Sequence, residues 1–340
     1  MRKKFKSAVV FVHGLGKKPS PEKLREIWLW AIERNEPKPD IFGYRNSGIN
    51  LDDQGIACFF TYWADVFYGS DYETDYQDQY ERANEAFIGT ENPEALVGKL
   101  KEPEPNTPHE IQFINNLQLK LDAKMAEELI TVEDDDLITN PFATQTGGLE
   151  IASWLPPPLK QAIIRKAAIE AYYYLFNKEY QRSDGISFQV RRELRNRLLT
   201  DLHAAKETAE KVIIVSHSMG TMLAYDVLRN VADCPHIDTL FTLGSPLGIS
   251  EIQDELRADG TKNADFPAAR LLRWVNVFDP KDLICGLSPY FAREYLPVDG
   301  KIVEDINESN WGAWRHTATH YLAGIKFRTE LAASLEIDLS

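Results

Sequence analysis

The chain has 340 residues, of which 44% are hydrophobic and 26% charged, ordinary values for a globular protein with a sizeable core. Its 52 acidic and 38 basic residues give a net charge of −14, which repels phosphate backbones and argues against nucleic acid as a partner. No stretch approaches the roughly 20 apolar residues that a transmembrane helix needs, and the basic start lacks the apolar run of a signal peptide.

Three cysteines, Cys58, Cys234 and Cys285, are too few and too scattered for a disulfide framework or a metal site. This usage favours a reducing compartment, and we expect a cytoplasmic protein. Residues 13–16 lack the Gly-x-Gly-x-x-Gly of a dinucleotide site, and no Cys/His/Asp cluster indicates zinc. The sequence therefore predicts neither a cofactor nor a metal, and it leaves the oligomeric state open.

The first predicted strand covers residues 8–12 and runs directly into His13-Gly14-Leu15-Gly16. A helix follows, with Ser20 as N-cap and Pro21 in its first turn. Residues 56–63 are then predicted to form a second strand, which completes a βαβ start. The apolar face of the helix has the spacing i, i+3, i+4, i+7 and consists of Leu24, Ile27, Trp28 and Ala31.

Residues 66–184 differ in character, with tyrosines, acids and prolines and little that is typical of strands. A helix is predicted after Pro156-Pro157-Pro158, and the acidic run Glu133–Asp136 is predicted to be a solvated loop. We expect a mainly helical insertion that could cover a site as a cap. Its aromatic residues, such as Trp154 and Tyr172 to Tyr174, would line a pocket or form the insertion's own core.

Alternation of strand and helix resumes after residue 191. Strands are predicted at residues 212–215, 239–243, 271–278 and 301–303, and a closing helix at 327–335. The expected organisation is an α/β core of residues 1–65 and 185–340, with a mostly parallel central sheet and helices on both faces, interrupted by the insertion at 66–184.

Ser218 is the strongest candidate for a reactive residue. The buried strand at 212–215 leads through Ser216 and His217 to this serine, and a helix begins at Met219. Such a strand–serine–helix turn is a nucleophile elbow, which requires small neighbours where the chain nearly touches itself. Ser216 replaces the usual first glycine of Gly-x-Ser-x-Gly, and Gly220 supplies the close helix approach.

Four segments together resemble the α/β-hydrolase superfamily, specifically its lipase-like and esterase-like serine hydrolases. The opening segment with the later Thr-Tyr-Trp-Ala-Asp also resembles uncharacterised bacterial members. The likeness covers about two thirds of the chain and leaves the insertion unexplained. The matching segments are Val-Val-Phe-Val-His13-Gly14-Leu15-Gly16, Ser216-His-Ser218-Met-Gly220, Thr-Leu-Gly244-Ser-Pro-Leu-Gly248 and Asn276-Val-Phe-Asp-Pro-Lys-Asp282-Leu-Ile.

The resemblance implies a role for each segment. In the family's order of nucleophile, acid and histidine, Asp282 would orient His316 as the base for Ser218, with Asp279 and His320 as alternates. The backbone N–H groups of Leu15 and Met219 would form the oxyanion hole. The supporting residues would be His13, which shapes the loop, together with Gly14, Gly16 and Gly220, and His217 would have a packing role.

These residues predict a serine hydrolase acting on a small-molecule acyl ester. Thioester or amide hydrolysis and acyl transfer use the same triad, so they are alternative activities. A different class of function is a non-catalytic scaffold that binds a partner protein through the insertion.

Overall fold

The computed structural model describes residues 4–35, 47–72, 100–135, 157–257, 261–285, 287–310 and 315–339. Six described strands form one sheet in the order β2-β1-β5-β6-β7-β8, and every neighbouring pair is parallel. This confirms the predicted α/β class with a parallel central sheet. The strands are β1 (Phe5–Val12), β2 (Ala57–Thr61), β5 (Ala209–His217), β6 (Ile237–Leu243), β7 (Leu271–Phe278) and β8 (Val303–Asn307).

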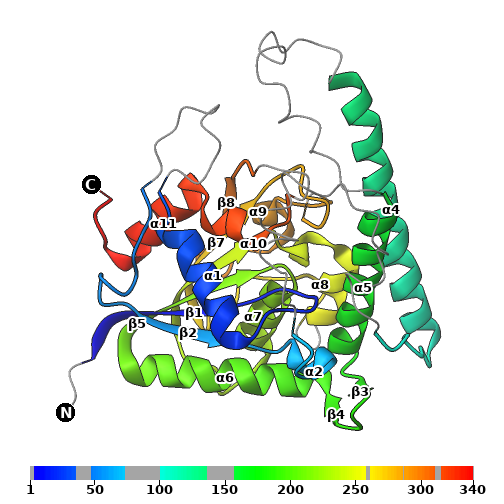
Figure 1. Ribbon diagram of the computed structural model, residues 1–340, viewed down its shortest axis with the longest axis horizontal. Coiled ribbons are helices and arrows are strands. Elements are labelled where there is room, and N and C mark those ends of the chain that lie inside the picture. The colour runs from blue at the N-terminus through cyan, green and yellow to red at the C-terminus, as the bar shows by residue number, and fades with distance from the viewer. Residues whose placement is uncertain are drawn as a thin grey trace.

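Helices cover both faces of this sheet, with α1 and α11 on one side and α6 and α7 on the other (Figure 1). The helices are α1 (Pro21–Glu33), α2 (Asp65–Tyr68), α4 (Pro108–Asp135), α5 (Pro157–Leu175), α6 (Val190–Thr208), α7 (Met219–Asn230), α8 (Ser250–Leu256), α9 (Phe291–Glu294), α10 (Ala318–Leu322) and α11 (Ile325–Leu335), with a short 3₁₀ helix η3 (Pro246–Gly248). None of them, within the described part of the chain, combines the length and apolar content needed to cross a bilayer.

Two apolar cores follow from the alternation of side chains along each strand. In β1, Val9 and Phe11 face α1 and α11, whereas Ala8, Val10 and Val12 face α6 and α7. Central strands are buried on both faces, which explains why they are continuous apolar runs in the sequence. Residues 212–215, the predicted strand, are the fully buried middle of β5.

The start of α1 agrees with the prediction. Pro21 is its first residue, and the Ser20 hydroxyl accepts a hydrogen bond from the Lys23 backbone N–H at 3.3 Å. The predicted apolar face is buried and consists of Leu24, Ile27, Trp28 and Ala31.

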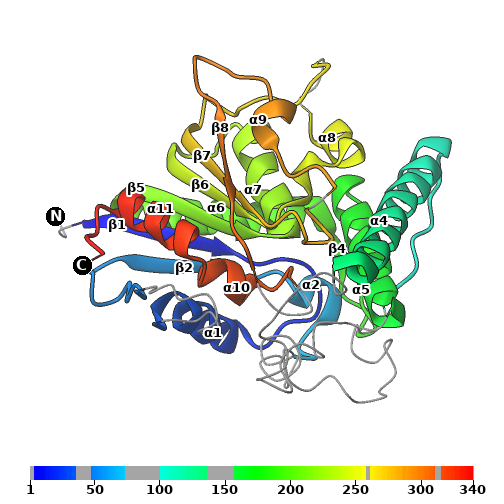
Figure 2. The same ribbon diagram turned by 90° about the horizontal axis from the view of Figure 1, so that it is seen from above.

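Helices α4 and α5 lie side by side beyond the carboxyl ends of the strands (Figures 1 and 2). They make up most of what is described of residues 66–184, and Trp154 lies outside the described residues. The acidic run was expected to be a loop, but Glu133 to Asp135 continue α4 as its last turn, while Asp136 is not described. Glutamate has a good helix propensity, which favours continuing an established helix through the acidic run.

An antiparallel pair, β3 (Glu179–Gln181) and β4 (Ser187–Gln189), connects α5 to α6. The predicted boundary between residues 184 and 185 lies in its turn, where Gly185 has a φ of +86°. The pair is too short for the sequence to show a strand period.

Three consecutive tyrosines of α5, Tyr172 to Tyr174, are buried and belong to the core rather than to a pocket. The Tyr174 hydroxyl donates to the carboxylate of Asp226 on α7 at 2.6 Å. Arg191 and Arg195 of α6 also bind that carboxylate. Burial raises the pKa of Asp226, but the hydrogen bond from Arg195 and the charge of Arg191 outweigh it and lower the pKa to about 2. This ion cluster joins α5, α6 and α7.

The order in which strands are added to the sheet reverses between β1 and β5. The chain adds β2 on one side of this pair and β6, β7 and β8 on the other side. Ligand sites of open parallel sheets form at such a switch point, beyond the carboxyl ends of the strands. The loop after β1 contains His13 to Gly16, and the turn after β5 contains Ser218.

Candidate active site

Ser218 lies between the last residue of β5 and the first of α7. Its φ of +54° and ψ of −130° place a non-glycine residue in a sparsely populated backbone region. Its N–H donates to the Leu243 carbonyl oxygen at 3.0 Å, which fixes the turn against β6. A Cβ at Gly220 would lie 2.5 Å from the carbonyl oxygen of His13, so α7 can approach the β1 loop only through glycine.

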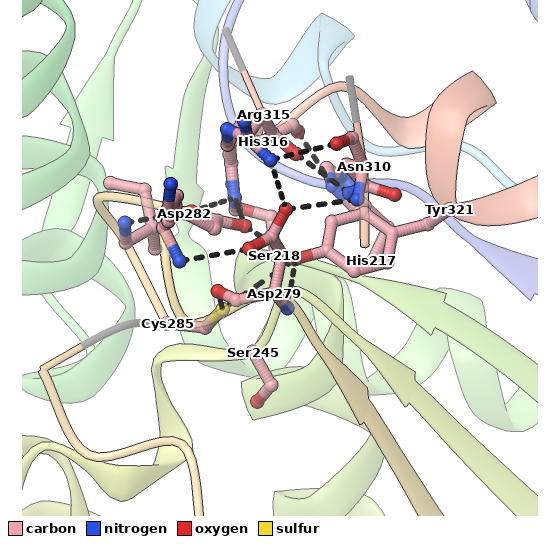
Figure 3. A network of polar contacts seen from close by, with 12 residues as sticks. His217, Ser218, Ser245, Asp279, Asp282, Cys285, Asn310, Arg315, His316 and Tyr321 are labelled. Atoms are coloured by element: carbon pink, nitrogen blue, oxygen red, sulfur yellow. Dashed lines mark hydrogen bonds and ion pairs between the residues drawn. The ribbon is translucent and has the colours of Figure 1, made fainter. Parts of the chain in front are cut away.

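The side chains of Ser218, His316 and Asp282 form a chain of hydrogen bonds (Figure 3). Nε2 of His316 is 2.8 Å from the Ser218 hydroxyl oxygen. Nδ1 of His316 is 2.8 and 3.0 Å from the two Asp282 carboxylate oxygens. Since a carboxylate only accepts, Nδ1 carries the hydrogen and Nε2 is left to accept the serine proton.

Asp282 is fully buried after β7 and accepts two further hydrogen bonds, from the Tyr321 hydroxyl at 2.7 Å and the Ile284 N–H at 2.8 Å. Burial raises the pKa of Asp282, but the neighbouring His316 and these donors outweigh it and lower the pKa overall. The ionised carboxylate is therefore the stable form beside the imidazole. Tyr321 was not predicted as a site residue, since its only signal in the sequence is its place five residues after His316.

The two alternates have other positions. Asp279 accepts from the N–H groups of Lys281 and Asn310, at 2.8 and 2.9 Å, and pairs with Arg315 at 3.1 Å. It thus holds together the loops after β7 and β8 (Figure 3). His320 is buried on α10, and the imidazole between Ser218 and Asp282 is that of His316.

His217 packs against His316, with the two ring centroids 4.7 Å apart. Its Nε2 is 3.0 Å from the His316 carbonyl oxygen, so this nitrogen carries the hydrogen and donates. Burial lowers the pKa of His217 well below its usual value, which keeps the ring neutral. The side chain has the predicted packing role and supports the backbone of His316.

His13 shapes the loop after β1. Its Nε2 accepts from the Trp63 N–H at 3.0 Å, and its Nδ1 therefore donates to the Gly14 carbonyl oxygen at 2.7 Å. Burial lowers the pKa of His13 to about 3, so the ring is neutral. A Cβ at Gly14 would lie 2.6 Å from the Ser218 Cβ, which shows how closely this loop adjoins the serine. Gly16 is needed for its φ of +90° rather than for lack of room.

A small apolar pocket opens at Ser218. Leu15 and Met219, the predicted oxyanion pair, line it together with the serine. Its far walls come from α4, α5 and α8, and the lining on α5 consists of alanines rather than the tyrosines. Among the residues that the structure describes, no group of three or more His, Cys, Asp or Glu is arranged to hold a metal ion.

Comparison with known protein families and with curated proteins finds no match. Among solved structures, an uncharacterized protein from Pseudomonas aeruginosa is similar at 12% sequence identity and a TM-score of 0.26. That similarity covers 98% of this chain and 49% of the other, so the chain spans about half the length of that protein. A likeness this weak carries no argument about fold or function.

Proposed function

We propose that the protein is a serine hydrolase of the α/β-hydrolase fold that cleaves carboxylic esters through an acyl-enzyme on Ser218. The observation that carries the proposal is the hydrogen-bonded chain from Ser218 through His316 to the buried Asp282. A serine hydroxyl needs a base within hydrogen-bond reach and a third group that orients the base, and these distances satisfy both needs.

In the proposed acylation, Ser218 Oγ attacks the ester carbonyl carbon while its proton passes to His316 Nε2. The tetrahedral intermediate places its negative oxygen against the N–H groups of Leu15 and Met219, whose residues line the pocket beside the serine. Collapse breaks the bond to the alcohol oxygen, which takes the proton from His316. Asp282 stabilises the imidazolium of His316 that exists between these two proton transfers.

Deacylation repeats these steps with water. His316 accepts a proton from water, the resulting hydroxide attacks the acyl carbon, and the proton returns to Ser218 Oγ as the carboxylic acid leaves. The apolar lining of the pocket favours an apolar acyl group, because burying it there removes hydrocarbon from water without stranding polar groups.

The test is labelling with a fluorophosphonate probe, which phosphonylates an activated serine with loss of fluoride. The wild type should be labelled, and Ser218→Ala should lose both labelling and hydrolysis of p-nitrophenyl esters, the latter by roughly 10⁶-fold. Ser216→Ala is the matched control, because Ser216 is also buried at the end of β5 but its hydroxyl donates to the Phe241 carbonyl oxygen at 2.8 Å. A wild type that resists labelling would favour the scaffold function instead. Acyl-thioesters tested beside esters of graded chain length separate ester from thioester hydrolysis.

A further inference from the structure

A carboxylate on α5, Glu170, is fully buried at the loop that follows β1. A buried charge is costly unless hydrogen bonds and opposite charges compensate it. Both oxygens of Glu170 accept from the Gly16 N–H at 3.1 Å, and one accepts from the Tyr68 hydroxyl at 2.6 Å. Burial raises the pKa of Glu170, while Lys166, one turn earlier on α5, favours the ionised form.

The peptide between Leu15 and Gly16 is held at both of its polar ends. Its N–H belongs to Gly16 and donates to Glu170, and its carbonyl oxygen belongs to Leu15 and accepts from Lys18 Nζ at 2.6 Å. Because a peptide unit is planar, fixing the two opposite ends fixes the orientation of the whole plane. The Glu170 carboxyl group and the Lys18 ammonium group therefore determine together how this peptide is turned.

This peptide adjoins the proposed oxyanion donor. Leu15 lines the pocket beside Ser218, and the preceding Gly14 lies against the serine. Gly14 and Gly16 give the loop little stiffness of its own, since glycine is the most permissive residue for the backbone. The Leu15 N–H belongs to the preceding Gly14–Leu15 peptide, whose carbonyl oxygen accepts from His13, and its direction depends also on how the adjoining Leu15–Gly16 peptide is held.

We propose that Glu170 is a positioning residue that, with Lys18, holds the Leu15–Gly16 peptide so that the Leu15 N–H faces the oxyanion. The inference rests on the proposed hydrolase function. It gives α5, which lies in the segment 66–184, a part in catalysis through the loop after β1, in addition to the alanines it contributes to the pocket.

Glu110 provides a matched control in the same pair of helices. This carboxylate of α4 is also buried and also accepts from a tyrosine and a backbone N–H, and in addition it accepts from a lysine. It does not bind the loop after β1. Its donors are Tyr172 at 2.8 Å, the Asn106 N–H at 3.1 Å and Lys178 at 2.9 Å.

The experiment measures the rate of fluorophosphonate labelling and kcat and KM for a p-nitrophenyl ester. Glu170→Ala should lower the labelling rate and kcat by about 100-fold, towards the full loss of one oxyanion donor, with KM unchanged. Glu170→Gln, which keeps an acceptor oxygen, should lose about tenfold. Glu110→Gln and Glu110→Ala should lower thermal stability without changing either rate by more than about twofold.

Lys18→Met keeps the test decisive if Glu170→Ala does not fold, because Lys18 is half-exposed and holds the other end of the same peptide. It should lower the rates about tenfold, and Glu170→Gln with Lys18→Met should lose little more than either alone, since both act on one peptide. A combined loss near 100-fold, the product of the two single losses, would mean that Glu170 and Lys18 act independently.

The outcomes separate this inference from the function on which it rests. Suppose that the wild type is labelled but the Glu170 and Lys18 variants react at the wild-type rate, or lose no more than the Glu110 variants. The positioning role would then be wrong, and the proposed hydrolase function would be unaffected. A wild type without labelling at Ser218 overturns both.

Discussion

Gly244, the residue after β6, lies against the hydrogen bond between Asp282 and His316. Its φ is +55°, and a Cβ built there would lie 3.0 Å from an Asp282 carboxylate oxygen and 3.2 Å from His316 Nδ1. Carbon contacts are favourable only near 3.5 to 4.0 Å. In Gly244→Ala the methyl group would therefore press on both atoms of the hydrogen bond that orients the base.

The cost of this substitution has two parts. Left-handed backbone strain in alanine is about 1–2 kcal/mol, of which about 0.4–1 kcal/mol is offset by the reduced entropy of the unfolded chain. Overpacking adds about 1–3 kcal/mol, giving a total loss of roughly 1–5 kcal/mol. Displacing a catalytic group by about 1 Å can lower the rate about 100-fold, and because the methyl group needs no more than about that much room, we expect a loss in kcat of about 10- to 100-fold.

Gly55→Ala separates the two parts, because Gly55 has a similar φ of +66° and no atom within 4 Å of its Cβ position. It should cost about 1 kcal/mol from strain alone and leave kcat unchanged. The assay is hydrolysis of a p-nitrophenyl ester, with the free energy of unfolding from urea denaturation. If folded Gly244→Ala kept kcat within about threefold of the wild type, the assigned roles of Asp282 and His316 would be refuted.

Two further predictions concern carboxylates. Asp282→Asn should lower kcat/KM by roughly 10⁴-fold, because an amide facing Nδ1 favours the wrong tautomer of His316. Asp279→Asn should lower kcat/KM by less than about tenfold. Equal losses would contradict the choice of Asp282 over Asp279. The pKa of Asp226 is lowered from 3.8 to about 2, so its carboxylate contributes about 2 kcal/mol to the free energy of unfolding. This contribution is fully present above about pH 4 and is lost as the pH falls to about 2. Urea denaturation at pH 5 and pH 2.5 should show this loss in the wild type, and Asp226→Asn should lack that share of the pH dependence.

Most of the core was predictable from local patterns. Buried parallel strands are continuous β-branched runs, and residues 212–215 and 271–278 accordingly fall within or coincide with β5 and β7. The edge strand predicted at residues 301–303 shares only Val303 with β8 (Val303–Asn307), because an edge strand has fewer buried positions and a weaker pattern. The turn at Ser218 was predictable because strand, serine and helix are contiguous in the sequence.

Residues that act across the fold left no such signal. Glu170 binds a loop 154 residues away in the chain, and Tyr321 binds a carboxylate 39 residues away. Neither lies in a motif whose spacing has a physical reason, and each looks in the sequence like one more residue of a helix. The choice between His316 and His320 likewise depended on the path of the loop after β8, which no local pattern determines.

The parallel sheet also bears on when the Ser218–His316 contact can form. The two residues are 98 positions apart and follow different strands, and Asp282 follows a third. When parallel strands from distant segments pair, the chain loses loop-closure entropy before any contact compensates the loss, and such pairings therefore form slowly. The contact therefore requires β5, β6, β7 and β8 to be paired in register, and a partly folded chain has Ser218 without its contact to His316.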